Sequence, residues 1–510
     1  MADLVNEKDY NSSDDGSGTT RSPEIFERPK GFRGFYTHPT TQVAMLGLVC
    51  FMCPGLFNAL SGIGGGGQLD VTTAANGNVA LYSTFTVMAF FAGSINNKLG
   101  ARLTLQIGSL GYGLYIASFL ALNIHPGAKA FVLAAGAILG VCAGLLWTAQ
   151  GSLMMAYPTE GDKAKYIAIF WAIFNLGGVV GSAVAFGNNF HTSAGSVNNG
   201  TYIGFLILTI IGALIPLFMV DPKHIIRSDG TKLTVPLNPS WRVEILGLYV
   251  ALKTDPMIIL LFPMFFASNW FYAWQFNDYN GALFNIRTRS LNSMLYWSSQ
   301  VLGAMMMAFI LDKKNVTRRT RAFIGWGVVL VLVFVVHGWG YAYQKYLSLR
   351  LFTGLLMHGN RTFTRASLAA IAPADRIDIH DKEYVGKVFL YIFFGLLDSA
   401  WQTNVYWLMG AMSNDPAKLA YFTGFYKSIQ SAGAVGSWRA DAVLTPYMNM
   451  FASTWGLSVA GLVFALPMIY LRVREHTDME DETVARMDDD GHVLPSAEVA
   501  AQQPEKKAEA

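Results

Sequence analysis

The sequence predicts an all-α membrane protein of about twelve transmembrane helices, arranged in two six-helix bundles. Of its 510 residues, 52% are hydrophobic and only 14% are charged, and the mean hydropathy is +0.33. An average soluble domain is about 25% charged, so this composition cannot supply the polar surface of a soluble protein. Apolar stretches of about 20 residues, long enough to cross a bilayer as a helix, recur along the chain. These observations place the chain in a lipid bilayer.

Apolar windows predict six spans in each half of the chain. They lie at 41–60, 77–96, 101–122, 129–154, 165–187, 200–220, 257–276, 293–311, 322–342, 384–408, 418–437 and 450–471. We therefore expect an N-terminal bundle at 41–221 and a C-terminal bundle at 257–471, joined by a polar cytoplasmic linker at 222–256. Residues 1–40 are expected to form a polar cytoplasmic tail, and residues 472–510 an acidic, disordered one.

The region 343–383 leaves the number of spans open. Its apolar stretch from Tyr346 to Met357 is interrupted by Arg350, and Arg361 follows. We expect an irregular outer loop that carries an interfacial helix. If the region crosses the membrane instead, the chain has thirteen spans and its C-terminus changes side.

Lysine and arginine positions predict the orientation, because these residues accumulate in cytoplasmic loops. The connections at 61–76 and 187–200 contain neither, which assigns them to the outer side. Both termini are then cytoplasmic, and Asn199 in the sequon Asn199-Gly200-Thr201 becomes an outer glycosylation acceptor. The plasma membrane is the default location, with an internal membrane as the alternative.

Charge and cysteine usage argue against several classes of function. A formal net charge of +3 is too small to indicate nucleic-acid binding. Cys50, Cys53 and Cys142 all lie in apolar stretches, which argues against a disulfide framework and a metal site. Cys50 and Cys53 form a C-x-x-C pair, for which packing on one helix face is favoured over redox chemistry. No H-E-x-x-H or G-x-S-x-G motif occurs, so we expect a non-enzyme with no catalytic residues, metal or cofactor.

Glycines predict turns and close helix packing. The segment 62–67 matches G-x-G-x-x-G literally, but it follows a membrane span and not the strand that a dinucleotide site requires. It is therefore expected to form a flexible outer turn. Gly136, Gly140 and Gly144 recur every four residues, as Gly177 and Gly181 do, and such small faces let membrane helices approach closely.

Two charged residues lie deep in the predicted bilayer. Asp398 is about fourteen residues into the tenth span and Lys427 about nine into the eleventh, so each is roughly 13–20 Å from a membrane surface. An unpaired charge at such a depth costs at least about 2.5–3.5 kcal/mol. The two side chains are expected either to form a solute or proton site or to form a structural ion pair.

Polar and aromatic side chains of other spans are expected to line the same cavity, because amides inside lipid need partners. This set comprises Asn58, Trp147, Gln150, Trp171, Asn175, Asn269, Gln275, Trp297, Gln300, Trp401 and Gln402. As binding candidates we select Trp147, Gln150, Asn175 and Gln402, in addition to the two charged residues. The N-terminal half has no carboxylate in the middle of a span, which weakens a proton-coupled mechanism.

The connection between the second and third predicted spans is expected to act as a gate. Segment 93–102 reads GSINNKLGAR, which resembles the loop signature of the major facilitator superfamily, G-x-x-x-D-basic-x-G-x-basic. The matching residues are Gly93, Asn97, Lys98, Gly100 and Arg102. Asn97 replaces the aspartate, which makes a charged gating contact neutral. A degenerate copy at 312–321 indicates internal duplication. The alternative interpretation of 93–102 is a basic turn that follows the positive-inside rule.

Three further segments look like the uncoordinated-93-like (UNC-93-like) branch of that superfamily. They read LWTAQG at 146–151, YPTE at 157–160 and GLLDSAWQ at 395–402. The resemblance implies the two-bundle fold over about residues 41–471, except 343–383. The branch includes a regulator of potassium channels and a trafficking chaperone for innate-immune receptors, and many members have no assigned substrate.

Two hypotheses for function follow. The first is a multi-pass secondary transporter of an unknown small solute, in which the bundles rock, segment 93–102 latches the cytoplasmic side, and Asp398 and Lys427 bind. The second is a non-transporting regulator or trafficking partner of a channel or other membrane protein on the same scaffold. The expected partners are thus the lipid bilayer with either a solute or a membrane protein, and no nucleic acid.

Overall fold

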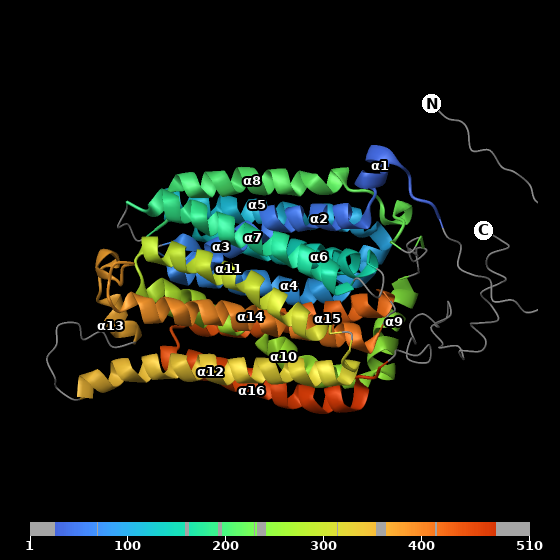
Figure 1. Cartoon of the computed structure of the whole chain (residues 1–510). Helices are drawn as coiled ribbons and strands as arrows, with labels where there is room; N and C mark the ends of the chain where they lie inside the picture. The colour runs from blue at the N-terminus through green and yellow to red at the C-terminus, as the bar shows by residue number, and fades with distance from the viewer. Residues whose placement is uncertain are drawn as a thin grey trace, which may run out of the picture.

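The computed structural model describes residues 26–475, except 69, 159–162, 192–195, 229, 232–240, 314, 353–363 and 414–415. Within these residues the chain is almost entirely helical, and an isolated β-bridge joins Phe284 to Ile377. The long helices run roughly along one common direction (Figure 1). Each helix thereby satisfies its backbone hydrogen bonds internally, as a bilayer requires.

The N-terminal half contains six spans, and a π-helical turn interrupts the first. In order they are α2 (Pro39–Cys50) with η1 (Phe51–Gly55) and α3 (Leu56–Ile63), then α4 (Val71–Leu99), α5 (Ala101–Ile124), α6 (Lys129–Ala156), α7 (Lys163–Asn189) and α8 (Asn199–Phe218). Each span covers most or all of one predicted apolar window.

The C-terminal half repeats this pattern, again with an irregular first span. In order its spans are η5 (Pro256–Leu261) with α10 (Phe262–Ala267) and η6 (Ala273–Gly281), then α11 (Ile286–Leu311), α12 (Arg318–Phe352), α14 (Tyr384–Met412), α15 (Pro416–Ala442) and α16 (Tyr447–Arg472). Among the described residues, ten helices are long and apolar enough to cross a membrane. The irregular seventh span and the more polar α15 bring the number to twelve. The predicted fold class is confirmed.

Two regions between spans contain helices whose bounds the sequence analysis did not give. The linker between the halves includes α9 (Trp241–Thr254), whose 14 residues are too few to cross a bilayer. In the region 343–383, α12 continues to Phe352, and α13 (Arg365–Ala369) lies near that same end of the molecule (Figure 1). The described part of this region therefore does not cross, and α1 (Gly31–Tyr36) lies on the same side as the end of α16.

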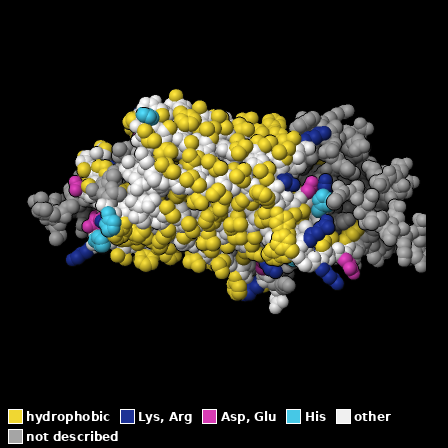
Figure 2. Space-filling view, turned by 90° about the horizontal axis from the view of Figure 1, so that it is seen from above, with side chains coloured by type: hydrophobic (Ala, Val, Ile, Leu, Met, Phe, Trp, Pro, Cys, Tyr) yellow, Lys and Arg dark blue, Asp and Glu magenta, His cyan; other side chains and the backbone are white. Residues whose placement is uncertain are grey.

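The surface of the molecule matches a bilayer environment. Figure 2 shows hydrophobic side chains over the whole middle of the visible face, with the charged side chains near the two ends. Leu110, Ile207 and Phe309 are 57%, 55% and 75% exposed. Such large apolar side chains are stable at the surface because lipid tails contact them there.

Close packing through glycine is confirmed at the predicted small-residue faces. A Cβ at Gly140 of α6 would lie 2.0 Å from the carbonyl oxygen of Leu81 in α4. A Cβ at Gly177 of α7 would lie 2.3 Å from the carbonyl oxygen of Phe51 in η1. Only glycine permits backbones to approach this closely, which compensates for the absence of a hydrophobic driving force between helices in lipid.

Candidate functional site

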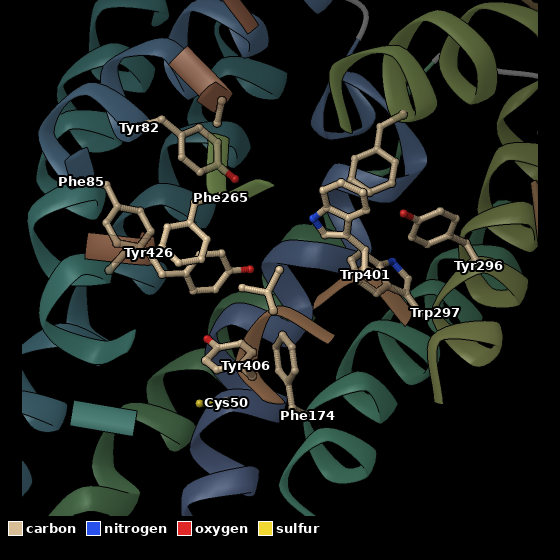
Figure 3. Close-up of a cluster of buried hydrophobic side chains, with 14 of the residues drawn as sticks. Cys50, Tyr82, Phe85, Phe174, Phe265, Tyr296, Trp297, Trp401, Tyr406 and Tyr426 are labelled. Atoms are coloured by element: carbon tan, nitrogen blue, oxygen red, sulfur yellow. The ribbon is translucent and has the colours of Figure 1, made fainter. Parts of the chain in front are cut away.

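A cavity of about 90 Å³ lies between the two halves of the molecule. Seven of the polar and aromatic residues predicted to face a common cavity line it: Asn58, Trp147, Trp171, Asn269, Trp297, Gln300 and Gln402. Figure 3 shows aromatic rings from both halves in this part of the core, with Tyr406 next to Tyr426 at a ring-centroid distance of 5.3 Å. The volume is sufficient for several water molecules or one small solute.

Asp398 lies behind the wall of this cavity, in the middle of α14, and is 1% exposed. Its Oδ2 accepts hydrogen bonds from the hydroxyls of Tyr272 (2.9 Å) and Tyr296 (3.0 Å) and from Nε2 of Gln300 (2.6 Å). Its Oδ1 accepts a fourth, from Nε2 of Gln402 (3.3 Å). A carboxylate buried in a membrane needs such a shell of donors.

Lys427 of α15 lines the cavity and is held by aromatic rings. Its Nζ lies 4.8 Å from the ring centroid of Trp147, 4.9 Å from that of Tyr426 and 5.5 Å from that of Tyr406. It also donates a hydrogen bond to Oε1 of Gln430 at 3.0 Å. The ring faces attract the ammonium group electrostatically. Because Trp147 belongs to α6, this cation contacts both halves of the molecule.

Two glutamines connect the buried carboxylate to the buried ammonium group. Nε2 of Gln430 donates to Oε1 of Gln402 at 3.2 Å, and Nε2 of Gln402 donates to Asp398. Within the described residues, Lys427 has no carboxylate within 4.0 Å. The direct structural ion pair, one of the two predicted arrangements, is therefore not what the structure contains. Gln402 lies one turn after Asp398 and Gln430 one turn after Lys427, so each helix carries its charge and its amide on one face.

Four of the six binding candidates meet around the cavity, and two do not. Gln150 and Asn175 are each 1% exposed but lie outside the cavity lining. Nε2 of Gln150 contacts Sδ of Met154 at 3.3 Å, and the amide of Asn175 has no hydrogen-bond partner among the described residues.

Sequence reasoning missed five members of the charged network: Tyr272, Tyr296, Tyr406, Tyr426 and Gln430. Gln430 carried a usable signal, because residues three apart on a helix share a face and Lys427 was already identified. The four tyrosines carried no such signal, because a tyrosine in an apolar span is equally compatible with packing in the core.

Arg289 of α11, which is 3% exposed, joins the two halves near the end of the molecule that the sequence analysis assigns to the outer side. Its Nε donates to the carbonyl oxygen of Ile63 at 2.7 Å, and its Nη2 donates to that of Gly64 at 2.6 Å. These carbonyls end α3, where a cation is favoured by the helix dipole. Nδ2 of Asn280 donates to the carbonyl oxygen of Gly62 at 2.8 Å. The glycine turn of the N-terminal half is thus bound to the C-terminal half.

Ion pairs connect the described part of region 343–383, which the sequence analysis assigns to the outer side, with the spans of the C-terminal half. Nη2 of Arg365 lies 3.1 Å from Asp278 and 2.9 Å from Asp441, and Nη2 of Arg287 lies 2.6 Å from Asp378. Burial alone would raise the pKa of Asp378, but the hydrogen bond from Arg287 outweighs it and holds that pKa below its ordinary value. These ion pairs fix the described part of the loop to the neighbouring spans of the same half.

The predicted gating segment lies at the end of the molecule that the sequence analysis assigns to the cytoplasmic side, and it contacts both halves. Nε of Arg102 donates to the carbonyl oxygen of Pro216 at 3.0 Å, and its Nη2 bonds that of Leu217, at the end of α8. A Cβ at Gly93 would lie 3.8 Å from the ring of Tyr421 in α15. Gly100, with φ of +79°, allows the sharp turn from α4 to α5. The side chain of Asn97 lies outside the described residues.

Asn199, the predicted glycosylation acceptor, begins α8 at the end assigned by the sequence analysis to the outer side, and it is exposed. Its Oδ1 accepts a hydrogen bond from Nδ2 of Asn123 at 2.6 Å. Glycosylation of this asparagine stays a prediction.

Solved structures share this architecture at low sequence identity. A D-xylose–proton symporter has a TM-score of 0.54 and 13% identity, with 90% of this chain and 100% of the symporter covered. A bacterial homologue of the iron transporter ferroportin in its outward-facing state has a TM-score of 0.54 and 9% identity, with 84% and 98% covered. At this identity the likeness establishes the fold alone: the chain has the same overall architecture as these solved transporters.

Sequence relatives identify the family. An UNC93-like protein of Schizosaccharomyces pombe is 45% identical over 469 residues, which are 91% of this chain and 89% of the relative. UNC93-like protein 1 of Arabidopsis thaliana is 39% identical over 446 residues, or 87% and 92% of the two chains. Residues 72–337 match the family model described as "Ion channel regulatory protein UNC-93". The chain is therefore a member of the UNC-93 family and an integral multi-pass membrane protein.

Proposed function

We propose that the protein is a secondary transporter that carries a small solute by alternating access. The observation that supports this most is the central cavity, which lies between the halves and takes polar and aromatic side chains from both. Buried charge beside such a cavity is costly in lipid and is typical of solute or ion pathways.

The interface between the halves supplies a mechanism for access. Arg289 binds the end of α3 on the outer side, so rotation of the halves that breaks these bonds opens the cavity outward. Gly93 and Tyr421 meet at the inner end, and their separation opens it inward. Because Lys427 contacts Trp147 across the interface, a solute bound to Lys427 is in contact with both halves.

A comparison of solutes inside and outside cells tests the proposal. It uses cells that lack the protein, cells restored with it, and cells restored with Asp398→Asn, which keeps the shape of the side chain but removes its charge. We expect a solute class that redistributes on loss and returns with the wild type but not with the variant. If the solutes are distributed alike in all three, while the wild type and the variant are present in the membrane in equal amounts, transport is contradicted.

The second candidate function is regulation or escort of another membrane protein. The description of the matching family, an ion channel regulatory protein, favours it, and so does the absence of a mid-membrane carboxylate from the described spans of the N-terminal half. Affinity capture from membranes discriminates the two. Stoichiometric co-purification with one channel, together with no solute flux, supports the regulator.

A further inference from the structure

We propose that the central cavity binds a small organic monocarboxylate and that Lys427 pairs with its carboxylate group. This rests on the transport proposal, because it names the class of solute for the same cavity. Three features of the cavity carry it: the sign of its charge, the lack of an internal counter-ion within reach, and the nature of its walls.

The charge that faces the cavity is positive. Among the described residues that line it, Lys427 is the only one with a charged side chain. An ammonium group has three N–H donors. Within the described residues Nζ donates one hydrogen bond, to Gln430, and its other contacts are ring faces. Donor capacity therefore remains for an acceptor that enters the cavity, and a solute cation would be repelled.

The nearest carboxylate does not neutralise this cation by direct contact. Asp398 lies outside the lining, and its oxygens already accept four hydrogen bonds from tyrosine and glutamine side chains. Gln402 and Gln430 lie between the two charges as neutral amides. A solute carboxylate can therefore pair with Lys427 without competing with Asp398 for it.

The volume and lining of the cavity favour a small organic solute with a single negative charge. Phe57, Phe85 and Phe174 contribute apolar ring surface to a volume of about 90 Å³. Such walls suit the hydrocarbon part of a small acid better than a hydrated inorganic anion. One cation in the lining suits one negative charge, because a second would remain unpaired in a desolvated site.

Matched acids and amides test this proposal on the full chain, purified and reconstituted in lipid nanodiscs. The probes are propionate with propionamide and benzoate with benzamide, which differ mainly in charge, and binding is measured by the shift in Tm with probe concentration. At least one acid is expected to bind about tenfold more tightly than its amide, the size of one charge-assisted hydrogen bond. Equal binding of acid and amide in both pairs overturns the proposal.

Lysine variants test which residue is responsible. Lys427→Met should weaken binding of the acid about tenfold or more. The control Lys387→Met removes another buried lysine, which pairs with Glu383 near the outer end, and should leave the affinity unchanged. Lys427→Arg retains the positive charge and should retain preference for the acid over the amide, which separates loss of charge from loss of fold. Unchanged affinity in Lys427→Met overturns the proposal.

Flux in proteoliposomes separates this proposal from the transport proposal. If the acid binds through Lys427 but does not cross the membrane, the carboxylate site stands and transport is contradicted. If a neutral or cationic solute is carried equally well by wild type and Lys427→Met, transport stands and the carboxylate site is overturned.

Discussion

The two halves of the molecule share one architecture but differ in chemistry. Arg102, at the start of the third span, binds the carbonyl that ends the sixth, at Pro216. Arg319, at the start of the ninth, binds the carbonyl of Val473 just after the twelfth, at 3.0 Å. The first span of each half also contains a π-helical segment beside the cavity, a feature that is frequent at functional sites. Equivalent contacts at equivalent places are expected of an internal duplication.

The halves differ in where they place charge. Away from the helix ends, the described spans of the N-terminal half carry no charged residue, while those of the C-terminal half carry Asp398 and Lys427. The C-terminal half adds the buried Arg289 in the first turn of α11. The N-terminal half contributes aromatic walls and glycine contacts instead. The N-terminal half thus lines the cavity with uncharged side chains. The C-terminal half supplies the charged residues at the cavity and at the contact of Arg289 with α3.

The largest expected effect comes from removing the carboxylate of the C-terminal half. Asp398→Ala leaves four donors without their acceptor and Lys427 without a nearby negative charge, so the free energy of unfolding should fall by about 3–5 kcal/mol. The matched change in the N-terminal half is Asn175→Leu. It removes a buried amide that has no partner within the described residues and should change stability by less than about 1 kcal/mol.

Unfolding in detergent micelles, followed by tryptophan fluorescence, measures both variants. Equal losses of stability in Asp398→Ala and Asn175→Leu would contradict the unequal roles of the halves.

The next effect concerns the outer closure. Arg289→Met removes two charge-assisted hydrogen bonds across the halves, so backbone amides of the turn at 62–67 should exchange with deuterium about ten- to hundredfold faster. Lys387→Met is the control, because Lys387 pairs within its own half and should leave this exchange unchanged. Exchange at wild-type rates in Arg289→Met would show that other contacts hold the outer end closed.

A smaller effect tests the equivalence of the duplicated contacts. Arg102→Met and Arg319→Met each remove a cation from the end of a helix, worth about 1 kcal/mol. Because the two arginines lie in different halves, the double variant should lose the sum of the two to within about 0.5 kcal/mol. Thermal unfolding checks this, and a loss confined to one arginine would contradict the equivalence.

The smallest effects depend on pH and involve Asp70 and Asp378, one in each half. For Asp70, burial alone would raise the pKa, but hydrogen bonds from Lys129 and Thr73 outweigh it and lower the pKa. The pKa of Asp378 is lowered in the same way by Arg287. A carboxyl group whose pKa is lower in the folded state stabilises above its unfolded pKa of about 3.9, and this contribution is lost as the pH falls through the folded value.

Asp378→Asn should therefore cost about 1 kcal/mol at pH 7 and at pH 5, and Asp70→Asn about 0.5 kcal/mol, because the pair of Asp70 with Lys129 is more exposed. Both differences should shrink below about pH 4. Unfolding measured at pH 7, 5 and 3.5 checks this, and a cost that grows on acidification would reverse the assignment.

The spans could be predicted because lipid forces each crossing segment to be apolar and helical. The depth of Asp398 and Lys427 followed from the same count, and the structure brings them into one network. Gln150 and Asn175 were selected at suitable depths but lie outside the lining, because depth does not fix which way a side chain points around its helix. Arg289 was missed because the eighth span was expected to begin at 293, whereas α11 begins at Ile286.

Access to the cavity from the two faces of the membrane tests the central claim most directly. In a chain with its three native cysteines replaced by alanine, Asn58→Cys places a thiol in the cavity wall. A membrane-impermeant thiol reagent is applied to the outer or inner face of sealed vesicles. Alternating access predicts modification from either face, with Arg289→Met raising the outer rate and lowering the inner one. Modification from one face only, with both rates unchanged by Arg289→Met, would contradict it.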